Sequence, residues 1–145
     1  HLLEQTFVIY RLHAYHTNQR NELKKSKKIY FNDLGIRNAL INDFRDVSLR
    51  NDIGGMFENF ITNELKKQNA YKRKYAQFHF WRSTEQKEID LILSKNSFLH
   101  AFEIKWNPEK KPRLHRGFAN NYPNHRFHVI HRDNFEEFLE MSFMD

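Results

Sequence analysis

Three neighbouring segments in the second half of the chain alternate between apolar and polar side chains with a period of two residues. This period is typical of half-buried β-strands, and it predicts strands over residues 77–82, 88–93 and 98–106. Residues 94–97 form the expected turn between the last two strands. The chain is therefore expected to fold around a sheet that contains an antiparallel hairpin.

A longer helix is expected just before these strands. Ile53, Phe57, Ile61 and Leu65 recur at helical spacing over residues 53–68 and define one buried face. The aspartate that precedes this segment is the expected N-cap of the helix, because its side chain can accept a backbone hydrogen bond of the first turn.

The remaining elements complete the core. A helix is expected over residues 113–121, a strand over residues 126–131, and a final helix from Asp133 or Asn134 to about residue 142. Taken with the preceding segments, the order is α-β-β-β-α-β-α. This order predicts an α/β fold with a mixed central sheet and flanking helices.

The first part of the chain carries fewer clear patterns. Strands are predicted over residues 6–15 and 28–31, and a polar loop over residues 18–26 connects them. A capped helix is expected over residues 34–42.

The size and composition of the chain fit a single domain. It has 145 residues, and Phe occurs 14 times, so a compact core can form although only 39% of the residues are hydrophobic. We expect residues 1–50 to form an N-terminal extension and residues 51–145 to form the core. Because the first residue is His1 and not Met, we also expect a fragment of a longer protein.

The sequence argues against several classes of protein. The longest apolar runs are far shorter than the ~18 residues that a membrane span needs. The first residues lack the basic and apolar pattern of a secretory signal. The chain has no cysteine, so neither a disulfide framework nor a thiolate metal site can form. These features predict a cytoplasmic protein that does not enter a membrane.

The net charge of +6 favours an anionic partner, with nucleic acid first among the candidates. A net charge of about 2–8 also serves solubility alone in many small domains. Basic residues form three runs in or beside predicted loops: Lys24, Lys25, Lys27 and Lys28; Lys72, Arg73 and Lys74; and Lys110, Lys111, Arg113 and Arg116. The residues expected to contact phosphates are Lys72, Arg73, Lys74, Arg113 and Arg116. A solvated surface is the alternative for each run.

Strand alternation places Asp90, Glu103 and Lys105 on one face of the predicted hairpin. If Leu93 pairs with Phe98, Glu103 lies diagonally across from Asp90, and a loop longer by two residues at each strand end is expected to put the two acids directly opposite each other. Either register keeps the three side chains on the same face.

Two converging carboxylates form a site of hard oxygen ligands, which suits Mg²⁺ or Mn²⁺. Such an ion polarises a phosphoryl oxygen and activates a water molecule, and the ammonium of Lys105 can stabilise developing negative charge. Glu58 falls at the border of the buried helix face and is a third candidate ligand, beside Asp90 and Glu103. The simpler alternative is a solvated Glu-x-Lys ion pair of little energetic value.

Five short phrases occur in an order that is similar to a known family of nucleases. They are K-K-I-Y-F-N-D-L-G at 27–35, G-M-F-E-N-F at 55–60, F-W-R at 80–82, E-I-D at 88–90 and F-E-I-K at 102–105. Their order, with Glu58 on a helix and Asp90 and Glu103 on successive strands, resembles the PD-(D/E)XK superfamily, the restriction-endonuclease-like fold. More narrowly, the chain resembles a domain of unknown function found C-terminal to AAA-type ATPase domains in bacteria and archaea.

The resemblance implies an α-β-β-β-α-β core, Mg²⁺ use by an active site at Asp90, Glu103, Lys105 and Glu58, and an upstream ATPase domain as a partner. This chain has no G-x-x-x-x-G-K-[ST] loop and is expected to have no ATP site of that type. It departs from some nucleases of the superfamily because no Gln follows Lys105 on the same strand.

Three functions remain open from the sequence. The first is a Mg²⁺-dependent endonuclease that cuts DNA, with DNA or RNA not distinguished by the residues. The second is a catalytically silent nucleic-acid-binding or regulatory module of an ATPase, and the third is a protein-interaction domain, including a homo-oligomer. Arg82, at the end of the first core strand, either contacts a phosphate or forms an ion pair with Glu88.

Overall fold

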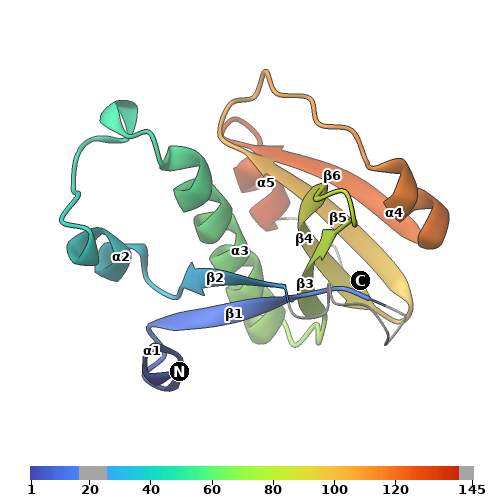
Figure 1. Ribbon diagram of the computed structural model, residues 1–145, viewed down its shortest axis with the longest axis horizontal. Coiled ribbons are helices and arrows are strands. Elements are labelled where there is room, and N and C mark those ends of the chain that lie inside the picture. The colour runs from blue at the N-terminus through green and yellow to red at the C-terminus, as the bar shows by residue number, and fades with distance from the viewer. Residues whose placement is uncertain (17–25, 141–145) are drawn as a thin grey trace.

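The computed structural model describes residues 1–16 and 26–140, and this part of the chain contains one six-stranded sheet (Figure 1). The strands lie in the spatial order β2-β1-β3-β4-β5-β6. Their bounds are β1 Ile9–Ala14, β2 Lys27–Phe31, β3 Gln77–Arg82, β4 Glu88–Lys95, β5 Phe98–Lys105 and β6 His125–His131. β1 pairs with β3, and β5 with β6, in parallel, whereas the other neighbours are antiparallel. The expected α/β fold with a mixed sheet is confirmed.

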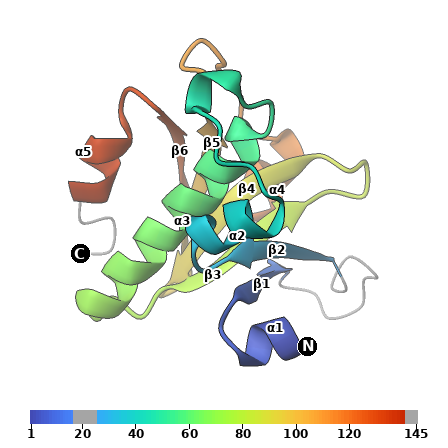
Figure 2. The same cartoon turned by 90° about the vertical axis from the view of Figure 1, so that its left-hand side faces the viewer.

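Helices pack on both faces of this sheet. Within the described residues they are α1 Leu2–Gln5, α2 Leu34–Leu40, the short 3-10 helix η2 Val47–Leu49, α3 Ile53–Tyr71, α4 Arg116–Asn121 and α5 Phe135–Glu140. Figure 2 shows α3 lying across the front of the sheet, with α2 beside it. The predicted order α-β-β-β-α-β-α is present from α3 to α5. No helix in residues 1–16 and 26–140 is both long enough and apolar enough to cross a bilayer.

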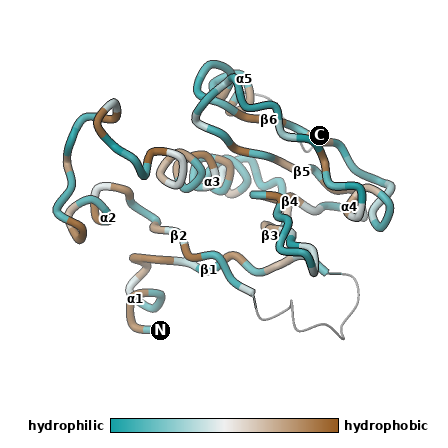
Figure 3. The backbone as a smooth tube through the Cα atoms, turned by 45° about the horizontal axis from the view of Figure 1, so that its top comes forward, coloured by the Kyte–Doolittle hydropathy of each residue, from teal (hydrophilic) through white to brown (hydrophobic). Residues whose placement is uncertain are grey.

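The sheet separates two hydrophobic cores. The first lies under α3 and contains buried residues of α3 and the strands, among them Phe57, Ile61, Leu65, Phe80, Leu91, Leu93, Phe102 and Ile104. The second lies under α4 and consists of Trp81, Ile89, Ile92, Leu99, Ala101 and Phe118. Along α3 the tube in Figure 3 changes between brown and teal, and the apolar residues Phe57, Ile61 and Leu65 of this helix are buried in the first core.

β4 and β5 form a tight hairpin. Lys95 pairs with Phe98, so the turn consists of Asn96 and Ser97 alone. Both turn residues have positive φ, 50° and 63°, as a type I′ turn requires. The four-residue turn predicted from the sequence is too long, because its first two residues continue β4.

Other boundaries also differ from the prediction. The strand predicted from residue 6 begins at Ile9, since residues 2–5 form α1. α4 begins at Arg116, three residues later than predicted, because the ring of His115 accepts a hydrogen bond from the Gly117 N–H at 3.1 Å and caps the helix. Most of the predicted loop over residues 18–26 and the end of the predicted last helix lie outside the described residues.

The pairing of β3 with β4 shifts by one residue beside Asp90. His79 pairs with Ile92, but Trp81 pairs with Ile89, so β4 contributes one residue more than β3 at this point. This is the arrangement of a β-bulge, which changes the direction of neighbouring side chains. Ile89 and Ile92 consequently pack in the same core, although strict alternation predicts opposite faces for them.

Edge strand β2 is fastened to α3 by amide side chains. The Oδ1 atom of Asn59 accepts a hydrogen bond from the Phe31 N–H at 2.9 Å, and its Nδ2 donates to the Phe31 carbonyl at 2.8 Å. Asn63 donates to the same carbonyl at 2.9 Å. These bonds satisfy backbone groups that an edge strand otherwise leaves unpaired, and they hold β2 in one register against α3.

Candidate functional site

Asp90 and Glu103 meet at the end of the β4–β5 pair. Leu91 pairs with Phe102 and Lys95 with Phe98, so the turn is shorter than expected from the sequence and Leu93 does not pair with Phe98. Asp90 follows the last of these pairs, beside the β-bulge, and its carboxylate contacts the Ile104 N–H and Lys105. The two acids are 6% and 7% exposed.

A single ammonium group contacts both acids. Lys105 Nζ lies 2.7 Å from Asp90 Oδ2 and 2.7 Å from Glu103 Oε2. Asp90 Oδ2 also accepts a hydrogen bond from the Ile104 N–H at 2.8 Å, which fixes the orientation of this carboxylate. The structure therefore brings Asp90, Glu103 and Lys105 together.

Burial raises the pKa of Glu103 to about 7, and the neighbouring charge of Asp90 acts in the same direction. Lys105 opposes this change but does not cancel it. Burial works to lower the pKa of Lys105, yet the charges of Asp90 and Glu103 outweigh it and raise that pKa above its ordinary value. At this pair, one ammonium group offsets only part of the cost of burying two neighbouring carboxyl groups.

Glu58 approaches this pair from α3 with another ammonium group between them. Lys28 Nζ of β2 lies 2.7 Å from Glu58 Oε1, 2.7 Å from Glu88 Oε1 and 3.7 Å from Asp90 Oδ1. The hydroxyl of Tyr30 also donates to Glu58 Oε1, at 2.5 Å. We call Glu58, Glu88, Asp90 and Glu103 the acidic cluster. Lys28 separates Glu58 from the other predicted ligands.

Arg82 belongs to the same charge network. Its Nε and Nη2 atoms lie 2.8 Å and 2.5 Å from Glu88 Oε2. Of the two roles considered from the sequence, the ion pair with Glu88 is the one present in the structure. Lys28, Arg82 and Lys105 together face four carboxylates, so the cluster is largely compensated from within.

The carboxylate oxygens at this site meet only the smallest ligand requirement of a magnesium ion. In the part of the chain that the structure describes, no three acidic or histidine side chains are grouped so that they could hold a metal ion. Mg²⁺, however, is commonly held by one or two carboxylates, with water and substrate oxygens completing its shell. Asp90 and Glu103 meet that smaller requirement, because both are hard oxygen donors on adjacent strands.

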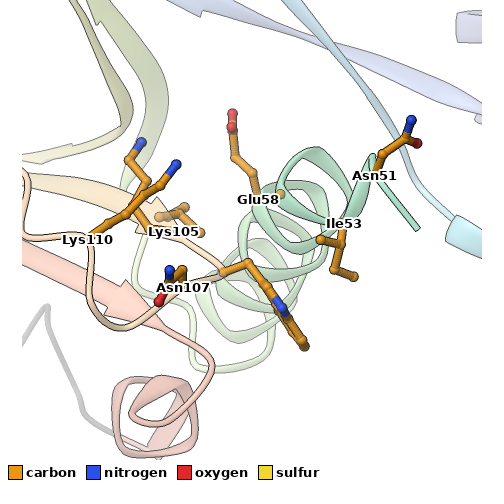
Figure 4. Close-up of a pocket in the computed structure, with 9 residues that line it drawn as sticks. Asn51, Ile53, Glu58, Lys105, Asn107 and Lys110 are labelled. Carbon is orange, nitrogen blue, oxygen red and sulfur yellow. The ribbon is translucent and has the colours of Figure 1, made fainter. Parts of the chain in front are cut away.

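A cavity of about 370 Å³ opens beside the cluster, between the start of α3 and the end of β5. Its polar lining includes Glu58, Lys105, Asn107 and Lys110. In Figure 4 the two lysines project from the β5 side and Glu58 projects from α3. The charged residues that line the cavity are thus two lysines and one glutamate, and the ammonium of one of these lysines, Lys105, is held by Asp90 and Glu103.

The other predicted phosphate-binding residues are not part of this site. Lys72 caps the C-terminal end of α3, and Arg73 and Lys74 follow it, whereas Glu58 lies in the second turn of the same helix. At 1.5 Å per residue, about 20 Å of helix separates Lys72 from Glu58. Arg113 and Arg116 lie before and at the start of α4, which packs on the opposite face of the sheet from α3.

The sequence does not single out two members of the cluster. Glu88 is expected only as a partner of Arg82, and Lys28 only as part of a basic run. Alternation along β2 does place Lys28 on the same side as the buried Tyr30, which is a local signal for an inward-facing lysine. Nothing local indicates that this side lies against β4 and α3.

Known proteins provide a family but no function. No curated protein and no solved structure is significantly similar to this chain. Residues 1–51 match a domain of unknown function, DUF8612. Residues 53–142 match another domain of unknown function, DUF4143. The expected resemblance to a domain of unknown function is confirmed, and because the second match covers more than half of the chain, the protein belongs to the DUF4143 family.

Proposed function

We propose that this domain binds nucleic acid and hydrolyses its phosphodiester backbone with a divalent cation, Mg²⁺ or Mn²⁺, held by Asp90 and Glu103. The observation that carries the proposal is the buried pair of opposed carboxylates with the ammonium of Lys105 at 2.7 Å from each. Burial of two neighbouring acids is costly, and Lys105 compensates only part of their charge, so a divalent ion would stabilise the pair further.

Each residue has a distinct task in this proposal. Asp90 and Glu103 supply oxygen ligands, and the Ile104 N–H holds Asp90 in place. A bound divalent ion would supply a Lewis acid and an activated water at this position. Lys105 lines the adjacent cavity, so its ammonium is placed to stabilise negative charge that develops on a phosphate there.

The substrate class follows from the charge of the cavity and of the chain. Lys105 and Lys110 face the cavity of about 370 Å³, and the chain carries a net charge of +6. Both features favour a phosphate-rich polymer, with DNA as the first candidate. The resemblance to PD-(D/E)XK nucleases and the core order from α3 to β6 support the same reaction class by analogy.

Cleavage of plasmid DNA in the presence of Mg²⁺ or Mn²⁺ tests the proposal. We expect Asp90→Asn and Lys105→Ala to lower the rate by on the order of 10²–10³-fold, as losses of groups that stabilise developing charge do. Glu85→Gln and Lys87→Ala, both exposed on the β3–β4 connection, are the matched controls and should retain wild-type rates. Full activity in both Asp90→Asn and Lys105→Ala would exclude the catalytic assignment.

A second function is favoured by a different observation. Lys28, Arg82 and Lys105 already compensate most of the charge of the acidic cluster. Such a network can serve stability alone, in which case the domain is a nucleic-acid-binding or regulatory module without catalysis. DNA retardation that weakens steeply with salt, without cleavage at any divalent-ion concentration, would select this function.

The wider setting is also part of the proposal. The resemblance implies that the domain works next to an AAA-type ATPase domain, which would supply ATP hydrolysis while this domain acts on nucleic acid. Co-expression of the two domains, followed by measurement of ATP hydrolysis with and without DNA, would test whether the activities are coupled.

A further inference from the structure

Exposed large apolar side chains are concentrated in the first third of the chain. Of the thirteen such residues in the part of the chain that the structure describes, ten lie between residues 2 and 49, and the other three are Tyr71, Tyr75 and Phe98. Six of the ten follow one another over α2 and the segment up to η2, and each is 44–69% exposed. We call these six residues the apolar patch: Ile36, Leu40, Ile41, Phe44, Val47 and Leu49.

The same segment buries a charged side chain. The side chain of Arg50 is 1% exposed. Its guanidinium donates to the carbonyl of Asp43 at 2.6 Å and to the two carboxylate oxygens of Asp52 at 2.9 Å and 2.8 Å. It also donates to Asn38 Oδ1 at 3.2 Å. The segment therefore encloses a guanidinium group and leaves its apolar side chains in water, which is the reverse of the usual arrangement.

Polar contacts within the segment give the patch a fixed shape. Asp33 caps α2 by accepting a hydrogen bond from the Ile36 N–H at 3.1 Å, and Asp46 caps η2 by accepting one from the Ser48 N–H at 2.9 Å. Figure 1 shows α2 and η2 farther from the sheet than α3, and Figure 2 looks onto this side of the molecule. An ordered surface loses little conformational entropy when a partner covers it.

The size of the apolar patch suits an interface between proteins. The exposed fractions correspond to on the order of 600 Å² of apolar surface, which is at the upper limit of what a monomer usually leaves in water. A standard interface buries about 800 Å² on each partner. Two patches that cover each other would bury about 1,200 Å² in total, and the polar groups at their rims would add to this area. That total reaches the range of specific interfaces.

The charge of the segment disfavours nucleic acid and anionic lipid as partners. Residues 33–52 contain four acidic and three basic side chains, so their net charge is −1, whereas the whole chain carries +6. A polyanion is therefore not attracted to this surface. Two copies of the chain repel each other through their positive charge elsewhere, and they repel least where this segment of one copy meets that of the other.

The rim of the patch carries charges of both signs. The side chain of Arg45 is 58% exposed, and its guanidinium pairs with Asp43 at 2.9 Å. Asp46 follows Arg45 directly and is also exposed. A two-fold axis brings the same surface of two copies together, so a surface with neighbouring opposite charges can place the arginine of one copy against an acid of the other. The patch is therefore suited to a second copy of itself.

We propose that the apolar patch is the interface of a two-fold symmetric homodimer, in which α2 and the segment up to η2 pack against the same elements of a second copy. Leu49 is followed after one residue by Asn51, which lines the cavity beside the acidic cluster. The two cavities of the dimer would therefore lie near its interface. The inference does not depend on the reaction proposed for these cavities.

Sedimentation equilibrium over a range of concentrations tests the dimer. We expect the mass to rise from 17.8 kDa towards twice that value, with a dissociation constant on the order of 10 µM. Leu40→Asp and Phe44→Asp each place a charge within the apolar patch and should weaken association by about tenfold or more. Tyr71→Asp is the matched control, because it makes the same change at an 82% exposed aromatic residue at the end of α3. It should associate like wild type.

Two further measurements exclude other causes of a change in mass. The altered side chains are exposed, so all three variants should melt within a few degrees of wild type, and circular dichroism checks this. Sedimentation is repeated in about 0.5 M NaCl, because salt weakens bridging by nucleic acid but not the burial of apolar surface. The dimer should persist under these conditions.

Several results would overturn the proposal. A wild-type chain that stays monomeric up to about 0.5 mM would exclude the dimer and indicate a different protein as the occupant of the patch. Wild-type affinity in both Leu40→Asp and Phe44→Asp, or weakening by Tyr71→Asp alone, would place the interface elsewhere. Association that disappears in high salt would be due to bound nucleic acid.

Discussion

Asp90 and Glu103 share one ammonium group, with Lys105 Nζ 2.7 Å from a carboxylate oxygen of each. The acids lie on adjacent strands, and burial together with the charge of Asp90 raises the pKa of Glu103 to about 7. Proton binding and stability are therefore coupled at this pair.

Replacement of Glu103 by Gln should reduce the pH dependence of stability. The folded-state pKa of Glu103 is raised from 4.5 to about 7, so with rising pH the unfolded chain releases this proton first and wild type loses stability across that window. Lys105 offsets part of the loss. We expect Glu103→Gln to exceed wild type by on the order of 1–2 kcal/mol near pH 8 and to match it near pH 4. Urea unfolding at both pH values measures the difference, and parallel pH profiles would contradict it.

Loss of the amide that fastens β2 to α3 should destabilise the protein. Asn59→Ala removes two hydrogen bonds to Phe31 and leaves its partly buried N–H without this partner, while Asn63 still donates to the Phe31 carbonyl. We expect a loss of about 2–4 kcal/mol in the free energy of unfolding. Asn120→Ala, at an exposed position of α4, is the control. Hydrogen exchange at the Phe31 amide should accelerate in the first variant only, and unchanged exchange would show that β2 is held by other contacts.

Arg82 should act on stability more than on nucleic-acid binding. Its guanidinium is engaged by Glu88, so Arg82→Gln should cost about 0.5–1.5 kcal/mol of stability and change DNA affinity by less than about twofold. Arg11→Gln, on another strand with a single longer ion pair to Glu4, is the comparison. Fluorescence anisotropy at several salt concentrations provides the readout. A salt dependence reduced by about one counterion in Arg82→Gln would instead indicate the phosphate contact.

Lys110 should contribute more to DNA binding than Lys72. Lys110 lines the cavity beside the paired carboxylates, whereas Lys72 lies at the far end of α3 from Glu58. We expect Lys110→Ala to weaken DNA binding about three- to tenfold and to lower the salt dependence by about one counterion. Lys72→Ala should leave both quantities near wild type. The opposite ranking would move the interface to the C-terminal end of α3.

Local patterns were sufficient for most of the secondary structure. The bounds of β3 and the start of α3 agree with the prediction, because alternation and helical spacing report directly which side chains face the core. The convergence of Asp90, Glu103 and Lys105 also follows from one short hairpin. The sequence did not decide the pairing register of this hairpin. The register depends on a turn of two residues, Asn96 and Ser97, that both adopt positive φ.

Features that depend on contacts distant in sequence could not be read in this way. The β-bulge beside Asp90 arises from how β3 pairs with β4, and it reverses the expected face of Ile89. The cap provided by the ring of His115 shortens α4, because it satisfies a backbone N–H that would otherwise belong to a longer helix. In both cases a packing or hydrogen-bonding partner changes the structure that the local periodicity of apolar residues predicts.

The sequence by itself determined the order of elements from α3 to α5, the α/β class and the presence of Asp90, Glu103 and Lys105 on one hairpin, since each depends on side-chain periodicity within a few residues. Only the tertiary structure decided that β2 is held against α3 and that Lys28 enters the acidic cluster between Glu58 and Asp90. The spatial order β2-β1-β3-β4 follows from burial and hydrogen bonding summed over the whole sheet. The residues next to Lys28 in the sequence therefore do not indicate which strands and helices surround its side chain.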